Sequence, residues 1–185
     1  MYNNKSKKND KRNDIPTPTL LCDFLYDLLI PHYKPDIILD PSSGDGRLAK
    51  PFLVKTKSKV IQYEIKKGKD FLKETKKINC DMVLCNPPFN SGNGKKLIGE
   101  LFLNKIFELC GNDIPVIMFC PMGQRLNNVK KSIRWRDMRD ILPPITTIIT
   151  LPIDIFDDTK FHSEILCFNT DKLNPHYFLP DDVIL

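Results

Sequence analysis

Two short segments of the sequence contain the residues best suited to chemistry. Residues 86–89 read Asn-Pro-Pro-Phe, directly after an apolar run. Consecutive prolines fix the backbone and remove two N–H donors, which leaves carbonyl oxygens as acceptors beside the asparagine side-chain oxygen. Such a pair of acceptors suits an NH2 group, and the phenylalanine offers a flat face on which a base can stack. The alternative is a plain Asn-Pro-Pro turn that binds nothing.

The second segment is a turn that contains glycine. Residues 40–46 read Asp-Pro-Ser-Ser-Gly-Asp-Gly, and glycines after a strand let the backbone turn tightly and approach a ligand. Glu64 ends the next apolar run, which is where an acid holds ribose hydroxyls in this kind of fold. The turn has no lysine at its end, which excludes a P-loop. A plain turn and a surface carboxylate are the alternatives for these two features.

The elements that must position these segments alternate between helix and strand. Helical spacing of apolar residues and helix-stop signals predict helices from Thr17 or Thr19 to Pro31, over residues 48–54, over residues 97–109 and, with a basic surface, over residues 129–142. Short apolar runs predict strands at residues 37–39, 60–64, 81–85, 114–120, 145–151 and 161–168. The alternation predicts a parallel α/β sheet with helices on both faces. No helix separates the last two strands, so we expect them to pair antiparallel at one edge.

Length and composition fit one ordinary domain. The chain has 185 residues, 41% hydrophobic and 28% charged, with a net charge of +5. We expect a disordered basic tail at residues 1–14, a single domain at residues 15–172 and a C-terminal tail at residues 173–185. No apolar run is long enough to span a bilayer, which favours a cytoplasmic protein. The six cysteines form no CxxC pair and are expected to be reduced and structural, with no metal site.

In combination, the two segments resemble the S-adenosylmethionine-dependent amino-methyltransferases, specifically the N6-adenine group, over residues 17–169. The resemblance implies a Rossmann-like methyltransferase fold with a mostly parallel seven-stranded sheet, an antiparallel edge strand and S-adenosyl-L-methionine as cofactor. It implies a catalytic group of Asn86, Pro87, Pro88 and Phe89. The cofactor-binding residues that it implies are Thr17, Pro18, Asp40, Pro41, Ser42, Gly44, Gly46, Glu64, Asp70, Phe71 and Asn86.

The resemblance also assigns roles within that set. The turn at residues 40–46 corresponds to the loop that holds the methionine end of the cofactor, and Thr17-Pro18 to the segment that closes over it. Glu64 corresponds to the ribose ligand. Asp70 corresponds to the acid that accepts from the cofactor's adenine amino group, next to an apolar residue that packs on the ring. Residues 116–121 and 151–168 correspond to segments that support the target base.

Two departures from the family qualify these roles. The family usually has a full helix between the residues corresponding to Glu64 and Asp70, where this chain has five residues and a loop is expected. The family's DNA enzymes usually carry a separate target-recognition region, and we expect none in this sequence. The implied reaction is methylation of the adenine N6 amino group in DNA, with the base flipped out. The alternatives are adenine in RNA, a glutamine side chain of a protein, and a catalytically silent subunit of a complex.

Nucleic acid is therefore the expected partner, together with a recognition subunit or a second copy, and without a membrane. A host cytoplasm or nucleoid is the expected location if the gene is viral or plasmid-borne. Basic residues gather around Trp135 and after the Asn-Pro-Pro-Phe segment, and they are the candidate nucleic-acid surface. These residues are Lys95, Lys96, Arg125, Lys130, Lys131, Arg134, Arg136 and Arg139. The alternative is an ordinary solvated helix face.

Overall fold

The computed structural model describes residues 15–89, 97–126, 128–156 and 160–180. The expected tail at residues 1–14, together with Lys95 and Lys96, lies outside this part. The elements in chain order are α1 (Thr19–Leu29), β1 (Ile37–Asp40), η2 (Phe52–Thr56), β2 (Lys59–Gln62), η3 (Ile65–Lys67), η4 (Phe71–Lys73), β3 (Met82–Cys85), α2 (Ile98–Cys110), β4 (Val116–Pro121), α3 (Gly123–Leu126), α4 (Ile133–Arg136), η5 (Asp137–Ile141), β5 (Ile145–Thr150), β6 (Ser163–Phe168) and β7 (His176–Phe178).

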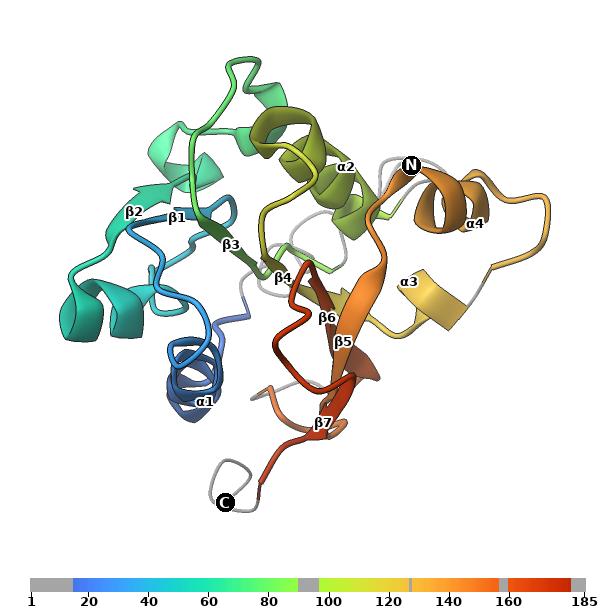
Figure 1. The fold of residues 1–185 in the computed structure, drawn as a ribbon. Helices are drawn as coiled ribbons and strands as arrows, with labels where there is room; N and C mark the ends of the chain where they lie inside the picture. The colour runs from blue at the N-terminus through green and yellow to red at the C-terminus, as the bar shows by residue number, and fades with distance from the viewer. Residues whose placement is uncertain (1–14, 90–96, 127, 157–159, 181–185) are drawn as a thin grey trace, which may run out of the picture.

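The strands form one mixed sheet in the order β2-β1-β3-β4-β6-β5-β7 (Figure 1). β1 pairs in parallel with β2 and β3, and β3 pairs in parallel with β4. β6 runs antiparallel to both of its neighbours, β4 and β5. The predicted fold class is confirmed, since the sheet has seven strands, is mostly parallel, and has its antiparallel strand near one edge.

The seventh strand comes from a segment that we expected to be a tail. β7 pairs in parallel with β5, with Ile148 opposite His176 and Thr150 opposite Phe178. The side chain of Thr147 donates to the Asn174 carbonyl at 3.0 Å and fixes the turn before β7. The sheet therefore continues to residue 178, beyond the domain end that we expected at residue 172. β7, rather than the antiparallel pair, forms this edge of the sheet.

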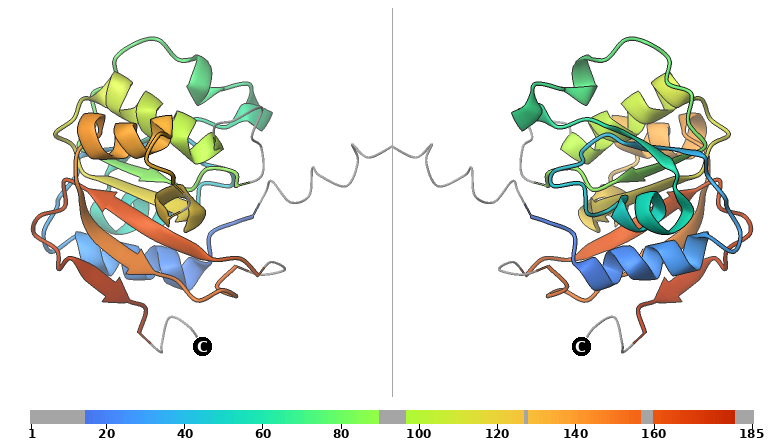
Figure 2. Two further views of the ribbon diagram at one scale, coloured as in Figure 1. Left: turned by 90° about the vertical axis from the view of Figure 1, so that its right-hand side faces the viewer. Right: turned by 90° about the vertical axis from the view of Figure 1, so that its left-hand side faces the viewer.

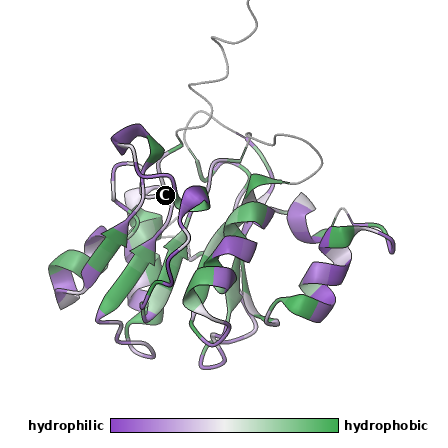
Figure 3. Cartoon of the chain, turned by 90° about the horizontal axis from the view of Figure 1, so that it is seen from above, coloured by the Kyte–Doolittle hydropathy of each residue, from purple (hydrophilic) through white to green (hydrophobic). Residues whose placement is uncertain are grey.

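Helices cover both faces of the sheet, as Figure 2 shows, with α1 and η2 on one face and α2 and α4 on the other. The α1 side is filled by large apolar residues such as Leu25 and Phe52, packed on alternate residues of the strands. Phe71 and Ile106 fill the opposite side. The strands in Figure 3 are mainly hydrophobic and the helices carry both colours, as expected for a sheet buried between amphipathic helices.

Several helices differ from the sequence prediction in length. The expected helix over residues 48–54 becomes the π-helical turn η2, and the expected basic helix over residues 129–142 is the shorter run formed by α4 and η5. The segment after Glu64 has the two 3₁₀ turns η3 and η4 where the resembled family has a full helix. Two carboxylates cap these turns, and this stabilises short turns without a long helix.

All six cysteines are free thiols, and five of them are buried. Within residues 15–89, 97–126, 128–156 and 160–180 there is no group of three or more histidine, cysteine or acidic side chains that could hold a metal ion. No helix in these same ranges is long and apolar enough to cross a membrane.

Candidate active site

The Asn-Pro-Pro-Phe segment and the glycine-containing turn meet at the carboxyl ends of the parallel strands. β1, β2 and β3 run in parallel, so the turn at residues 40–46, Glu64 and the segment at residues 86–89 all follow carboxyl ends of neighbouring strands. A cavity of about 720 Å³ opens there, a size suited to a nucleotide-like ligand. The predicted site residues on its wall are Thr17, Pro41, Ser42, Gly44, Glu64, Asp70, Phe71, Asn86, Pro87, Pro88 and Phe89. Pro18, Asp40 and Gly46 are not among the residues that line the cavity.

Backbone hydrogen bonds hold the glycine-containing turn against the end of β2. The Ser43 N–H donates to the Tyr63 carbonyl at 2.9 Å, and the Gly46 N–H donates to the Ser43 carbonyl at 2.6 Å. Gly46 has φ +86°, and a Cβ there would lie 2.9 Å from the side-chain nitrogen of Gln62. The positive φ favours glycine at this position, whereas the end of the flexible Gln62 side chain can move aside. Hydrogen bonds thus hold the turn where it lines the cavity.

Asp40 lies behind the cavity wall and is fully buried. Its Oδ1 accepts from the Ser42 N–H at 3.3 Å, and its Oδ2 has no hydrogen-bond partner in the described part of the chain. Burial raises the pKa of Asp40 to about 7; the Ser42 N–H opposes this rise, and the charges of Glu64 and Asp45 add to it. A cationic group bound near Asp40 would favour the charged carboxylate.

Glu64 and Asp70 stand at the two ends of the short loop that contains η3. Glu64 Oε1 accepts from the Lys66 N–H at 2.8 Å, and Asp70 Oδ1 accepts from the Leu72 N–H at 3.1 Å. Asp70 Oδ2 lies 3.4 Å from the Lys73 ammonium. Both Asp70 oxygens are therefore engaged, and an amino group bound at Asp70 must share them. The loop also places Lys66, Lys67 and Lys69 on the wall, which the sequence analysis missed although the run of lysines after Glu64 was visible.

The Asn86 side chain is held by a hydrogen bond to a residue that is distant in the sequence. Its Nδ2 donates to Thr17 Oγ1 at 3.0 Å, across 69 positions of sequence. Its Oδ1 is buried and has no hydrogen-bond partner among the residues that the structure describes. An unpartnered buried carbonyl oxygen is costly unless a ligand supplies a donor. Within the described part of the chain, Oδ1 is consequently an acceptor without a donor, on a residue that lines the cavity.

Phe89, the last residue of the Asn-Pro-Pro-Phe segment, belongs to a cluster of three aromatic rings. Its centroid lies 4.8 Å from that of Phe161 and 6.1 Å from that of Phe156. Phe156 and Phe161 are stacked at 5.6 Å with an interplanar angle of 10°. Both rings lie in residues 151–168, the segment expected to support a target base, but neither was among the predicted site residues. Their aromatic character just before the last long strand was the available signal.

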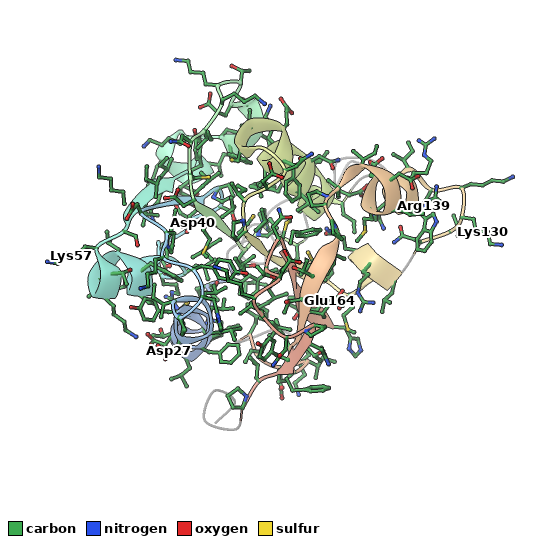
Figure 4. The ribbon with its side chains drawn as sticks, viewed as in Figure 1. Asp27, Asp40, Lys57, Lys130, Arg139 and Glu164 are labelled. Carbon is green, nitrogen blue, oxygen red and sulfur yellow. The ribbon has the colours of Figure 1, made fainter. Side chains whose placement is uncertain are left out.

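Three arginines of the expected nucleic-acid surface form ion pairs with carboxylates of the protein. Arg125 donates two hydrogen bonds to the buried carboxylate of Glu164. Nε of Arg134 lies 3.0 Å from Oε2 of the buried Glu100. Arg139 pairs with the neighbouring Asp140. Figure 4 shows Glu164 within the sheet and Lys130 and Arg139 at the outer end of the α4 side. Within the described ranges, Lys130, Lys131 and Arg136 are the members of the expected surface without an ion pair, so the candidate surface is smaller than predicted.

The fold is shared with several solved structures, although no family model matches the sequence and no curated protein is significantly similar to it. A modification subunit of a putative type I restriction enzyme from Vibrio vulnificus superposes with a TM-score of 0.66 at 16% identity, over 95% of this chain and 49% of that one. The type I restriction-modification methyltransferase subunit from Streptococcus thermophilus gives 0.62 at 18% identity, over 92% and 48%. A putative class I S-adenosylmethionine-dependent methyltransferase from Listeria monocytogenes gives 0.65 at 16% identity, over 94% and 68%.

This chain has a Rossmann-like methyltransferase fold. It spans about half the length of the two restriction-modification subunits. At such low identity the methyltransferase fold is what the similarity establishes, and the reaction has to be argued from the site.

Proposed function

We propose that this chain binds S-adenosyl-L-methionine and transfers its methyl group to the N6 amino nitrogen of adenine in DNA. The observation that carries the proposal is the buried, unpartnered Oδ1 of Asn86, which follows β3 at the edge of the cavity. An oxygen in that position suits an NH2 donor, and the carbonyl of Pro87 supplies a second acceptor beside it. The proposal draws further support from the methyltransferase fold and from the names of the structural neighbours, which are restriction-modification subunits.

The residues around the cavity fit the cofactor. Glu64 on the cavity wall suits the ribose hydroxyls because a carboxylate accepts from both. The Asp40 carboxylate, buried behind the turn with an Oδ2 that is unpartnered within the described residues, would attract a cationic amino group bound in the cavity. Asp70 and Phe71 suit the adenine end, as an acceptor and an apolar neighbour. When bound there, the cofactor supplies an electrophilic methyl group on a sulfonium.

Asn86 and Pro87 would act on the incoming base through two hydrogen bonds. The lone pair of the adenine amino nitrogen is delocalised into the ring, which makes it a poor nucleophile. Hydrogen bonds from its two N–H groups to Asn86 Oδ1 and the Pro87 carbonyl favour a more tetrahedral nitrogen with a localised lone pair. Catalysis is then positioning and electrostatics, without a covalent enzyme intermediate.

The direct test is transfer of labelled methyl from S-adenosylmethionine to duplex DNA, single-stranded DNA and RNA, followed by nucleoside analysis. The proposal expects N6-methyladenine in DNA. N6-methyladenine in RNA alone would support the same reaction with RNA, and not DNA, as the substrate. Cofactor binding without transfer to any of the three would contradict the proposal in favour of a protein glutamine substrate or a catalytically silent subunit.

Phe89→Ala is expected to lower kcat/KM for methyl transfer by about 5- to 150-fold, because one base–aromatic stacking contact contributes about 1–3 kcal/mol. The Kd for S-adenosylhomocysteine, measured by calorimetry, should change much less. Phe178→Ala is the matched control, since Phe178 is an exposed ring on β7. Equal losses of catalysis and cofactor affinity in the Phe89 variant would argue against stacking.

Lys130→Ala/Lys131→Ala is expected to weaken DNA binding and to reduce the slope of log K against log salt by about 2. Each lysine that neutralises a phosphate releases about one counterion. Fluorescence anisotropy at several salt concentrations measures the slope. Lys34→Ala/Lys59→Ala is the control, because these exposed lysines lie at the amino ends of β1 and β2, away from the cavity. Equal slopes for the two double variants would remove α4 and the segment before it from the DNA surface.

A further inference from the structure

Thr17 contacts the residue on which the proposed reaction depends. Its Oγ1 accepts from Asn86 Nδ2 at 3.0 Å, and both residues line the cavity. A side-chain amide can be turned so that either its oxygen or its nitrogen faces a given direction, and a hydroxyl can donate or accept. The hydrogen bond alone therefore does not determine which amide atom of Asn86 meets the substrate.

The backbone around Thr17 is held in place on three sides. Pro16 and Pro18 flank it and restrict its backbone. Its carbonyl accepts from the Cys22 thiol at 3.9 Å, in α1, and from Arg47 Nη1 at 3.5 Å, just after the glycine-containing turn. The residue itself is 4% exposed. The hydroxyl is thus a fixed point against which the Asn86 amide can be oriented.

The direction of this hydrogen bond depends on where the Thr17 proton goes. In the arrangement described, Oγ1 accepts from Asn86 and its own proton is left for another acceptor. If an acceptor such as a carboxylate binds at this end of the cavity, the hydroxyl donates to it and can only accept from Asn86. The Asn86 amide is then held with Nδ2 toward Thr17 and Oδ1 toward the substrate.

We propose that Thr17 is a positioning residue that turns Asn86 Oδ1 toward the target amino group, and that it does so when its own hydroxyl donates to the bound cofactor. This inference rests on the proposed function and adds that cofactor binding is coupled to the orientation of Asn86. Binding of the cofactor prepares the acceptor for the base. The same hydroxyl therefore contacts the cofactor and Asn86 at once.

The test compares Thr17→Val, which keeps the shape and removes the hydroxyl, with Thr17→Ser, which retains it. The first measurement is the NMR signal of the Asn86 side-chain NH2 with and without S-adenosylhomocysteine. We expect the ligand to slow solvent exchange of these protons in the wild type and in Thr17→Ser, and not in Thr17→Val. Thr19→Val is the control, because Thr19 is an exposed threonine two positions away.

The second measurement is the single-turnover rate of methyl transfer at saturating cofactor. Loss of the oriented hydrogen bond is expected to lower the rate about 10-fold or more in Thr17→Val, with recovery in Thr17→Ser. A residue that merely contacts the cofactor would raise KM and leave this rate unchanged. An unchanged rate in Thr17→Val, or an unchanged Asn86 signal, would overturn the inference. A wild-type protein that transfers no methyl group would contradict the proposed function, while the NMR signal would still decide the role of Thr17.

Discussion

Asn86→Ala is expected to reduce kcat for methyl transfer by about 100- to 1000-fold, the size of loss seen when one preorganised hydrogen-bonding group is removed from an active site. The reason is that Oδ1 of Asn86 is buried and unpartnered in the described part of the chain, so its hydrogen bond to the amino group forms without competition from another protein donor. The measurement is the single-turnover rate on adenine-containing DNA. The Kd for S-adenosylhomocysteine should stay within about threefold, because no more than one weak contact is lost.

Asn112→Ala is the matched control for this experiment. It makes the same change at an exposed position in the turn after α2. The control should keep wild-type turnover. Near-normal turnover in Asn86→Ala would contradict the mechanism, whatever happens to cofactor affinity.

Arg125→Ala is expected to lower the free energy of unfolding by about 2–4 kcal/mol, because it leaves the carboxylate of Glu164 buried without its cation. Glu164 is 1% exposed, and both of its oxygens accept from Arg125, at 3.1 and 2.8 Å. For a chain of this length the midpoint of thermal unfolding should fall by about 5–10 °C. Differential scanning calorimetry and urea titration measure the change.

Arg139→Ala provides the comparison. Arg139 pairs with its neighbour Asp140 at the exposed surface, where solvent screens the attraction, so its removal should leave the melting temperature unchanged. A second variant, Arg125→Ala/Glu164→Gln, removes the buried charge and should recover part of the lost stability. Equal melting temperatures for Arg125→Ala and Arg139→Ala would show that the pair with Glu164 is not structural.

The site segments were predictable because their signals are local. A glycine-containing turn, an acid and an Asn-Pro-Pro-Phe segment each directly follow an apolar run, and parallel strands bring such ends together whatever the details of the helices. The same reasoning gave the sheet and the helices on both faces. Both the sheet and the placement of the candidate segments depend on short-range patterns in the sequence.

The features that the sequence analysis missed depend on contacts between distant residues. Arg125 and Arg134 read as surface charges because Glu164 and Glu100, their partners, are far away in the sequence. β7 is three residues long, and it is a strand because β5 offers it an unpaired edge. No periodic pattern marks so short a segment. The contact between Phe89 and Phe161 likewise joins two loops that the fold alone brings together.

The position of β6 has a consequence for the order in which the protein can assemble during synthesis. β6 is made after β5 but lies between β4 and β5, so neither can complete its pairing on that side until residues 163–168 have left the ribosome. β2, β1, β3 and β4 can associate earlier, because they are close in sequence and joined by short crossovers. Until then the buried, apolar β4 presents an open edge. The nascent chain at that stage is an expected substrate for chaperones and the stage most exposed to aggregation.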